Sequence, residues 1–459
     1  VQFSSLAVAA LLSGAAIAAP TIQERGSCTF SGSSAAANVL KQKKSCSSII
    51  ISNAVVPAGT TLDLTGLNAG TTVTFQGTTT FGYKEWTGPL VSVSGDKLTV
   101  VGASGSVLDG QGSRWWDGKG TNGGKKKPKF FYAHKMTNSK IQNIKIKDSP
   151  VQIFSINNAK QLTLTGVTVD NSAGDGENKG HNTDAFDIGS SSGITISGAN
   201  IHNQDDCVAV NSGSDITVTG STCTGGHGLS IGSVGGRDDN TVSNVKFTNN
   251  KVTNSQNGLR IKTVYGATGK VSGIEYTGNT LSGISKYGIV IEQDYENGSP
   301  TGKPTNGVPI TGLTMNNNKV GVTSSGTNTY ILLPPVLAQL EVVWQHHLWW
   351  QEVQQVLWYP QRLWRRLLNV LRHLASQHNK QNQGVESVAV EQINHAFSSK
   401  FPIVIYNILN TQKDRPTRVF LVTQIFVSKF TVIIPRSRKA FLNINFTCST
   451  NLPDICRIA

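Results

Sequence analysis

The chain has 459 residues, of which 47 are Gly, 2 are Met and 15% are charged, and its formal net charge is +14. Sparse charge with many Gly, Thr, Ser, Asn and Val argues against a helical cytosolic protein and favours a β-rich extracellular one. The chain is long enough for one large domain or for two to three ordinary domains. The basic surplus attracts polyanions, and charge alone does not choose among nucleic acid, anionic lipid and acidic polysaccharide.

The N-terminus predicts secretion. Residues 3–19 are apolar and end in small residues, and Ala16-Ile17-Ala18 fits a small-x-small cleavage site. The run is too short to span a membrane and is typical of a signal peptide. We therefore interpret residues 1–18 as a signal peptide and residues 19–25 as a propeptide, although a buried apolar helix is the alternative. A secreted, extracellular location makes nucleic-acid and membrane partners unexpected.

Secretion permits disulfides. The chain has six Cys, and six Cys allow 15 connectivities, so the residues alone leave the pairing open. The six are Cys28, Cys46, Cys207, Cys223, Cys448 and Cys456.

Residues 26–332 repeat a short β-branched strand, a Gly- or Asn-rich turn and another strand. Successive repeats at Ile194, Ile216, Val242 and Val271 are 22, 26 and 29 residues apart. Such spacing predicts an all-β solenoid whose coils stack at about 4.8 Å, with Val, Ile and Leu inside. A Greek-key sandwich is the alternative. Several Asn fall at turns where they can stack or bond to the backbone: Asn143, Asn200, Asn203, Asn249 and Asn250.

Polar residues recur at the coil spacing. Asp184 and Asp206 are 22 residues apart, and His227 follows Asp206 by 21, so these residues and Asp205 are expected on three successive coils of one face. Crowded carboxyl groups raise at least one pKa, which gives glycoside hydrolysis its protonated acid and its ionised base. Turn residues or a calcium site are the structural alternatives for Asp205 and Asp206.

Arg260 and Lys262 flank one residue of a predicted strand, so both side chains should point to the same face. Two cations beside a carboxylate cluster suit a substrate that carries its own carboxylate, such as a uronic acid. A salt bridge to neighbouring Asp is the alternative. Tyr295 could stack on a sugar or cap a loop.

Ordered motifs resemble the fungal endo-polygalacturonases of glycoside hydrolase family 28 over about residues 28–332. These motifs are Asn182-Thr183-Asp184, Gln204-Asp205-Asp206-Cys207, Gly226-His227-Gly228 and Arg260-Ile261-Lys262, with support from the stretches 109–118 and 287–295. The resemblance implies a right-handed parallel β-helix and inverting hydrolysis of α-1,4 bonds in de-esterified pectin (polygalacturonate) without a metal or other cofactor. We also expect a monomer.

The same resemblance implies a role for each site residue. Asp205 would be the general acid, Asp184 and Asp206 would activate water, and His227 would support the acid. Inversion would place acid and base about 6.5–9.5 Å apart. The residues that would bind substrate are Arg260, Lys262, Tyr295 and Asn182. The disulfides implied are Cys28–Cys46 and Cys207–Cys223.

Three rivals stay open: a calcium-dependent pectate lyase, a rhamnogalacturonan hydrolase, and a carbohydrate-binding solenoid without activity. The run Lys125–Lys129 is interpreted as a solvated loop that attracts the polyanion.

Composition breaks after Leu332. Only Gly384 of the 47 Gly lies beyond it, and a helical stripe runs from Val343 to Leu374. Residues 333–459 are either a separate C-terminal domain or the product of a frame shift or intron read-through, and we prefer the second. Family members continue here with a Gly-rich, Cys-containing stretch, so the expected last coil is in doubt.

Overall fold

The structure is a computed structural model. It describes residues 26–297 and 299–334, and further strand backbones at 342–345, 355–357, 429–437, 440–448 and 456–458. The predicted signal peptide and propeptide lie outside the described residues, and so does most of the C-terminal tail. Among the described residues, no helix has the length and apolar character needed to cross a membrane.

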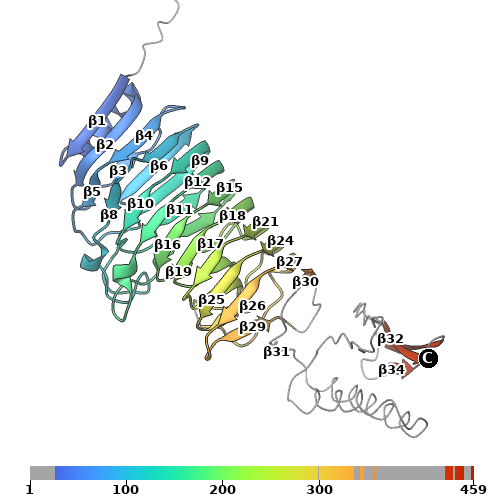
Figure 1. The fold of residues 1–459 in the computed structure, drawn as a ribbon. Coiled ribbons are helices and arrows are strands. Elements are labelled where there is room, and N and C mark those ends of the chain that lie inside the picture. Colours follow the sequence, from blue (N-terminus) through green and yellow to red (C-terminus); the bar gives the residue numbers. More distant parts are fainter. Residues whose placement is uncertain are drawn as a thin grey trace, which may run out of the picture.

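The body is a parallel β-helix, as the repeats predict (Figure 1). Each coil contributes one strand to each of three faces, and every strand pair between Gly26 and Leu332 is parallel. Because a Greek-key sandwich is built from antiparallel pairs, these pairings exclude it.

The strands of the first face, which carries the site described below, are β3 (Leu62–Leu64), β6 (Val91–Asp96), the start of β9 (Phe131–Gln142), β11 (Phe154–Asn157), β14 (Phe186–Gly189), β17 (Val208–Val210), β20 (Leu229–Val234), β23 (Asn257–Val264), β26 (Tyr287–Tyr295) and β29 (Thr327–Leu332). The strands of the second face are β1 (Gly26–Gly32), β2 (Cys46–Val56), β4 (Thr72–Gln76), β7 (Thr99–Gly102), the end of β9, β12 (Lys160–Thr165), β15 (Ser191–Ser197), β18 (Gly213–Thr219), β21 (Thr241–Thr248), β24 (Lys270–Thr277) and β27 (Ile310–Asn316). The strands of the third face are the end of β2, β5 (Thr78–Phe81), β8 (Val107–Asp109), β10 (Lys145–Lys147), β13 (Thr168–Asp170), β16 (Asn200–Asn203), β19 (Thr222–Gly225), β22 (Lys251–Thr253), β25 (Thr280–Ile284) and β28 (Lys319–Val322).

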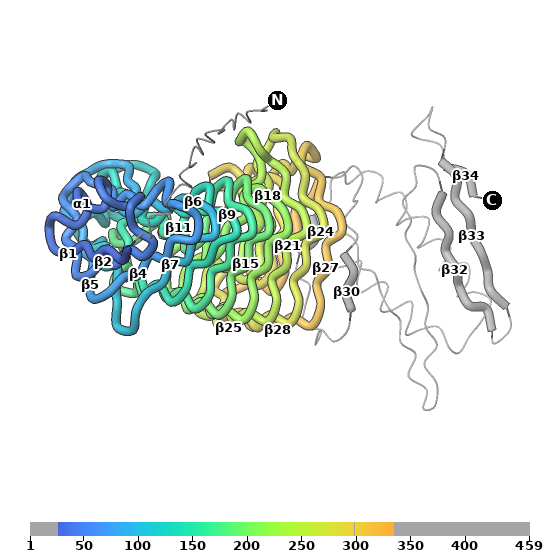
Figure 2. The backbone as a smooth tube through the Cα atoms, turned by 90° about the horizontal axis from the view of Figure 1, so that it is seen from above, coloured from blue at the N-terminus to red at the C-terminus, as the bar shows by residue number. Residues whose placement is uncertain are grey.

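Alternation along each strand fills the bore. Inward Ile188, Val210, Ile231 and Ile261 come from four successive coils in register, and each is fully buried. Figure 2 shows these successive coils side by side. The helix α1 (Ala35–Gln42) closes the N-terminal end and buries its apolar side against β1, β2 and β3. Short 3-10 turns lie at Lys43–Ser45, Gly112–Arg114 and Ser172–Gly174.

A buried asparagine ladder joins three coils at one turn. Asn250 Nδ2 donates to Asn279 Oδ1 at 3.0 Å, and Asn279 Nδ2 donates to Asn318 Oδ1 at 2.9 Å. Backbone carbonyls accept further bonds from Asn250 and Asn279 at 3.0 and 2.9 Å. Of the turn residues expected to stack or bond to the backbone, Asn250 and Asn203 do so, whereas Asn200 is exposed on β16.

The two disulfides among the described residues are Cys28–Cys46 and Cys207–Cys223, the pairs that the resemblance implies. Cys448 and Cys456 are opposite each other in the backbone register of β33 and β34. Their side chains lie outside the described residues.

The helical interpretation of Val343–Leu374 is wrong where the structure describes it. Residues Val342–Gln345 (β30) and Gln355–Leu357 (β31) are strands that pair in parallel with β27 and β29. The exposed edge of the last coil offers unpaired backbone groups, and pairing with them outweighs the helical periodicity. Farther on, β32 (Lys429–Ser437), β33 (Ala440–Cys448) and β34 (Cys456–Ile458) form an antiparallel sheet. The preference for a frame-shifted or read-through tail over a separate C-terminal domain at residues 333–459 stays a prediction.

Candidate active site

The turns that precede β14, β17 and β20 stack, and they carry Asp184, Asp206 and His227 at equivalent positions. Backbone bonds fix this register, because the Ala185 N–H donates to the Asp206 carbonyl at 2.9 Å and the Cys207 N–H donates to the Gly228 carbonyl at 2.9 Å. The coil spacing of 22 and 21 residues thus brings three polar groups to one side of the first face.

Asp205 is held between two donors. His227 Nδ1 lies 3.0 Å from Asp205 Oδ1, and Asn182 Nδ2 donates to Asp205 Oδ2 at 3.3 Å. Burial alone would raise the pKa of the Asp205 carboxyl. The charge and hydrogen bond of His227, together with Lys262, outweigh burial and hold this pKa below its usual range.

Asp206 is buried and has a different set of partners. Lys262 Nζ donates to Asp206 Oδ2 at 2.7 Å, and the Ser230 hydroxyl donates to Asp206 Oδ1 at 2.7 Å. Burial lowers the pKa of Lys262, but the negative charge of Asp206 outweighs this effect and raises it. Lys262 therefore stays charged beside Asp206, so two adjacent carboxyl groups sit in different surroundings.

Asp184 and Asp187 are carboxyl groups of this cluster with raised pKa values. Burial raises the pKa of Asp184 well above its usual range, and Asp205, Asp187 and Asp206 raise it further. Burial, opposed by Lys129, raises the pKa of Asp187 to about 7. The expectation that crowding raises at least one pKa in the cluster agrees with these directions.

Arg260 and Lys262 point to the same side of β23. The Arg260 guanidinium lies 5.5 Å and Lys262 Nζ 5.1 Å from the ring centre of Tyr295. Arg260 also forms a salt bridge of 2.8 Å with Glu292. Both cations thus have carboxylate partners within the chain. The partner of Lys262 is Asp206 of the Asp cluster, whereas the partner of Arg260 is Glu292, which lies outside that cluster.

Sequence reasoning missed Asp187, Ser230 and Glu292. Each faces outward from a strand whose neighbouring residues are buried. Ser230 and Glu292 lie one coil away from a residue that had been singled out, whereas Asp187 pairs in register with Ser155 and Ala209. Lys262, for example, pairs in register with Glu292. Strand alternation combined with the coil period could have found Ser230 and Glu292, and alternation alone predicts that Asp187 faces outward.

Asp205, Asp206 and His227 bring potential ligand atoms within 4.8 Å of one another. The chemistry of this set does not favour a metal ion, because Lys262 Nζ is 2.7 Å from Asp206 and His227 Nδ1 is 3.0 Å from Asp205. These donors already balance the two carboxylates, and a cation would have to displace them. We therefore still expect chemistry that needs no metal.

The run Lys125–Lys129 is not simply a solvated loop. Lys127 is buried, and its Nζ forms a salt bridge of 2.7 Å with Asp117, whereas Lys126 is exposed. Lys125 Nζ donates to the Arg114 carbonyl at 3.0 Å. The interpretation is wrong for Lys127 because the loop folds back on Asp117.

A parallel β-helix that holds clustered carboxyl groups beside an arginine and a tyrosine offers the paired carboxyl groups that glycoside hydrolysis uses. Residues 46–345 match the family described as glycosyl hydrolases family 28. The chain belongs to this family.

Similar proteins of known name support this family assignment. The chain is 68% identical over 311 residues to "Polygalacturonase" of Penicillium griseoroseum, covering 68% of this chain and 82% of that protein. It is 67% identical over 308 residues to "Endo-polygalacturonase" of Sclerotinia sclerotiorum, covering 67% of this chain and 80% of that protein. The solved structure of endopolygalacturonase I from Stereum purpureum, complexed with two galacturonate, matches with a TM-score of 0.60 and 34% identity, covering 70% of this chain and 100% of that one.

Proposed function

We propose that the protein is a secreted, monomeric endo-polygalacturonase that hydrolyses α-1,4-galacturonosyl bonds in polygalacturonate with inversion. The observation that carries the proposal is the separation of two adjacent carboxyl groups into different environments: Asp205 contacts His227, and Asp206 contacts Lys262. The names of the relatives identify the polymer. The family accounts for the hydrolysis.

In the proposed reaction Asp205 gives a proton to the glycosidic oxygen as the bond from C1 to that oxygen breaks. Water attacks C1 from the opposite side, and its proton passes to Asp184 or Asp206. One water is consumed, and its two hydrogens end on the leaving oxygen and on the new anomeric hydroxyl once the base releases its proton. General acid and base catalysis of this kind contributes about 10²–10⁴-fold each.

Asp205 must carry a proton when it acts, yet its pKa is depressed while His227 is charged. We infer that the proton of the acid is held by the Asp205–His227 pair, whose oxygen and nitrogen lie 3.0 Å apart. Transfer from Nδ1 to the carboxylate as the glycosidic oxygen approaches would leave a neutral ring and a protonated acid. His227 is then the reservoir and Asp205 the donor.

Arg260 and Tyr295 are proposed to bind substrate, whereas Lys262 and Asn182 are proposed to shape its site through Asp206 and Asp205. A galacturonate carboxylate would compete with Glu292 for the Arg260 guanidinium, which favours planar, bidentate partners. Tyr295 offers a ring face for sugar stacking on the leaving-group side. Lys262 would act mainly through Asp206, since its ammonium is already committed there.

The proposal is tested with purified protein on polygalacturonate, methyl-esterified pectin and rhamnogalacturonan. We expect release of reducing ends from polygalacturonate above the other two, insensitivity to chelators, and products without ultraviolet absorbance. Absorbing products that require calcium would indicate a lyase. Preference for rhamnogalacturonan would indicate the other hydrolase, and binding without cleavage would indicate a carbohydrate-binding solenoid. Product analysis by NMR should show the inverted anomer first.

The two carboxyl roles can be separated chemically. An oligogalacturonide with a nitrophenyl leaving group needs little help from an acid, so Asp205→Asn should retain far more activity on it than on the polymer. Asp184→Asn should be equally impaired on both substrates. The reverse pattern would make Asp184, the carboxyl with the raised pKa, the acid.

A further inference from the structure

Thr121 controls the amide of Asn182. The Thr121 backbone N–H donates to Asn182 Oδ1 at 3.0 Å, and its hydroxyl donates to the same oxygen at 3.2 Å. An amide side chain has one acceptor end and one donor end. With its oxygen held by Thr121, Asn182 turns its Nδ2 toward Asp205 Oδ2 at 3.3 Å.

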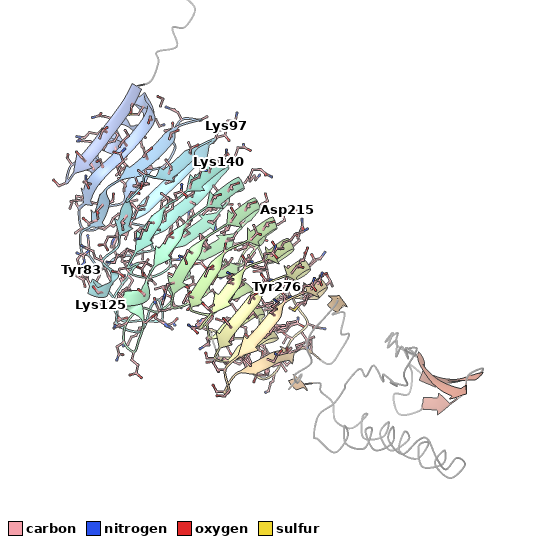
Figure 3. All side chains as sticks on the ribbon, viewed as in Figure 1. Tyr83, Lys97, Lys125, Lys140, Asp215 and Tyr276 are labelled. Carbon is pink, nitrogen blue, oxygen red and sulfur yellow. A yellow bond between two sulfur atoms is a disulfide. The ribbon has the colours of Figure 1, made fainter. Side chains whose placement is uncertain are left out.

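Asp117 holds the loop that carries Thr121. Asp117 Oδ1 accepts the Lys119 N–H at 3.0 Å, and Oδ2 accepts the Lys125 N–H at 2.9 Å. The buried ammonium of Lys127 adds a salt bridge of 2.7 Å. Burial acts to raise the pKa of Asp117, but these donors lower it to about 2, so the loop stays clamped at all but strongly acidic pH. Figure 3 shows Lys125 of this loop on the opposite side of the solenoid from Asp215.

Gly120 allows the loop to come this close. Its φ is +54°, and a Cβ at this position would lie 2.2 Å from Asn182 Oδ1 and 2.7 Å from the His181 carbonyl. The Gly118 N–H donates to the Lys179 carbonyl at 2.9 Å, which ties the loop to the segment before Asn182. A side chain at residue 120 would therefore push directly on the Asn182 amide.

We propose that Thr121 is a positioning residue for the general acid, acting through Asn182 on Asp205 with the Asp117 clamp behind it. This inference rests on the proposed role of Asp205. Thr121 itself touches no reacting atom. Its effect is to keep an N–H donor on Asp205 Oδ2, which orients the carboxyl and favours its ionised form.

The test compares Gly120→Ala, Asp117→Asn and Asn182→Ala with the unaltered protein on polygalacturonate. We expect kcat to fall about tenfold, the order of one lost hydrogen bond, with little change in KM. The alkaline limb of the kcat–pH profile, which reports loss of the acid's proton, should move up by roughly half a unit, because Asp205 loses a donor that favours its ionised form. Asp215→Asn is the matched control, since Asp215 also fixes a turn, through Asn244, and should leave kcat and profile unchanged.

A double-variant comparison shows whether the loop acts through Asn182. If it does, adding Gly120→Ala to Asn182→Ala should have no further effect on kcat. Additive losses would overturn the proposal, and so would folded Gly120→Ala and Asp117→Asn variants that keep the original kcat and profile. If Gly120→Ala does not fold, the kcat values and pH profiles of Asp117→Asn and Asn182→Ala test the proposal.

NMR titration of His227, whose Nδ1 contacts Asp205, provides a readout that does not depend on activity. A shifted His227 titration in Asn182→Ala and Asp117→Asn supports the inference, and an unchanged one overturns it. An unaltered protein that fails to cleave polygalacturonate would instead refute the proposed function, and the titration would still decide on Thr121.

Discussion

The asparagine ladder and the aspartate cluster are formed in the same way, but stacking stabilises the ladder and is unfavourable in the cluster. Both arise because residues one coil apart stack in register. In the ladder, Asn250, Asn279 and Asn318 donate to and accept from one another and the backbone, so buried polar groups are satisfied. In the cluster, like charges are brought together, and burial raises the pKa of Asp184 and Asp187.

This difference shows how a repeat separates stability from chemistry. An amide carries a donor and an acceptor, so identical amides stack favourably. A carboxylate carries only acceptors, so identical carboxylates repel unless protons or cations intervene. Each carboxylate has a donor of its own, Lys262 at Asp206 and His227 at Asp205, so the cluster is sensitive to the loss of either donor.

The largest loss of folding free energy is expected from Lys262→Met. Removing one partner of a buried ion pair leaves Asp206 uncompensated, which costs about 3–5 kcal/mol of folding free energy. Activity should fall by at least about 10²-fold, as for loss of a preorganised charge in an active site. Chemical denaturation and initial rates measure the two losses. Lys246→Met is the control, because its 3.6 Å pair with Glu275 is largely exposed and should be worth little. Equal effects of both changes would contradict the account.

The ladder should respond in stability alone. Asn279→Ala leaves several buried partners unsatisfied and should lower the free energy of unfolding by about 3 kcal/mol. Below the melting range its specific activity should remain close to the original. Thermal unfolding is the measurement, with the exposed Asn200→Ala as its control. A large loss of kcat at unchanged stability would show that the two regions are not separable in this way.

A smaller effect concerns pH. The pKa of Asp187 is raised to about 7, so its stabilising contribution is complete below the unfolded value of 3.8 and is lost as pH rises through 7. We expect Tm to fall between pH 4 and pH 8, and Asp187→Asn to reduce that fall by a few degrees. Asp184, raised in the same direction, should account for much of the remainder. Asp215 has a lowered pKa from its bonds to Asn244 and Ser214, so Asp215→Asn should not reduce the fall. An Asp187→Asn curve parallel to the original would refute this assignment.

Period and alternation explain how much could be predicted from sequence. The solenoid, the stacking of Asp184, Asp206 and His227, and the shared face of Arg260 and Lys262 all follow from residue spacing. Spacing does not reveal pairing partners, so the Lys262–Asp206 and Arg260–Glu292 contacts required coordinates.

Features that sequence reasoning missed or predicted wrongly depend on contacts between residues that are separated in the sequence. Lys127 is buried because Asp117 lies ten residues back on the same folded loop, and β30 and β31 are strands because the last coil has an open edge. Local composition predicts neither the burial of Lys127 nor the strands β30 and β31. Thr121 was missed for the same reason, since its partner Asn182 is 61 residues away.

Asp205→Asn tests the central claim most directly, because it removes the proposed proton donor while keeping the size of the side chain and one acceptor oxygen. Hydrolysis of polygalacturonate should fall by at least about 10³-fold, while calorimetric binding of oligogalacturonides and Tm stay close to those of the unaltered protein. Cleavage at an unchanged rate by the folded variant would contradict the assignment of this carboxylate cluster as the catalytic centre.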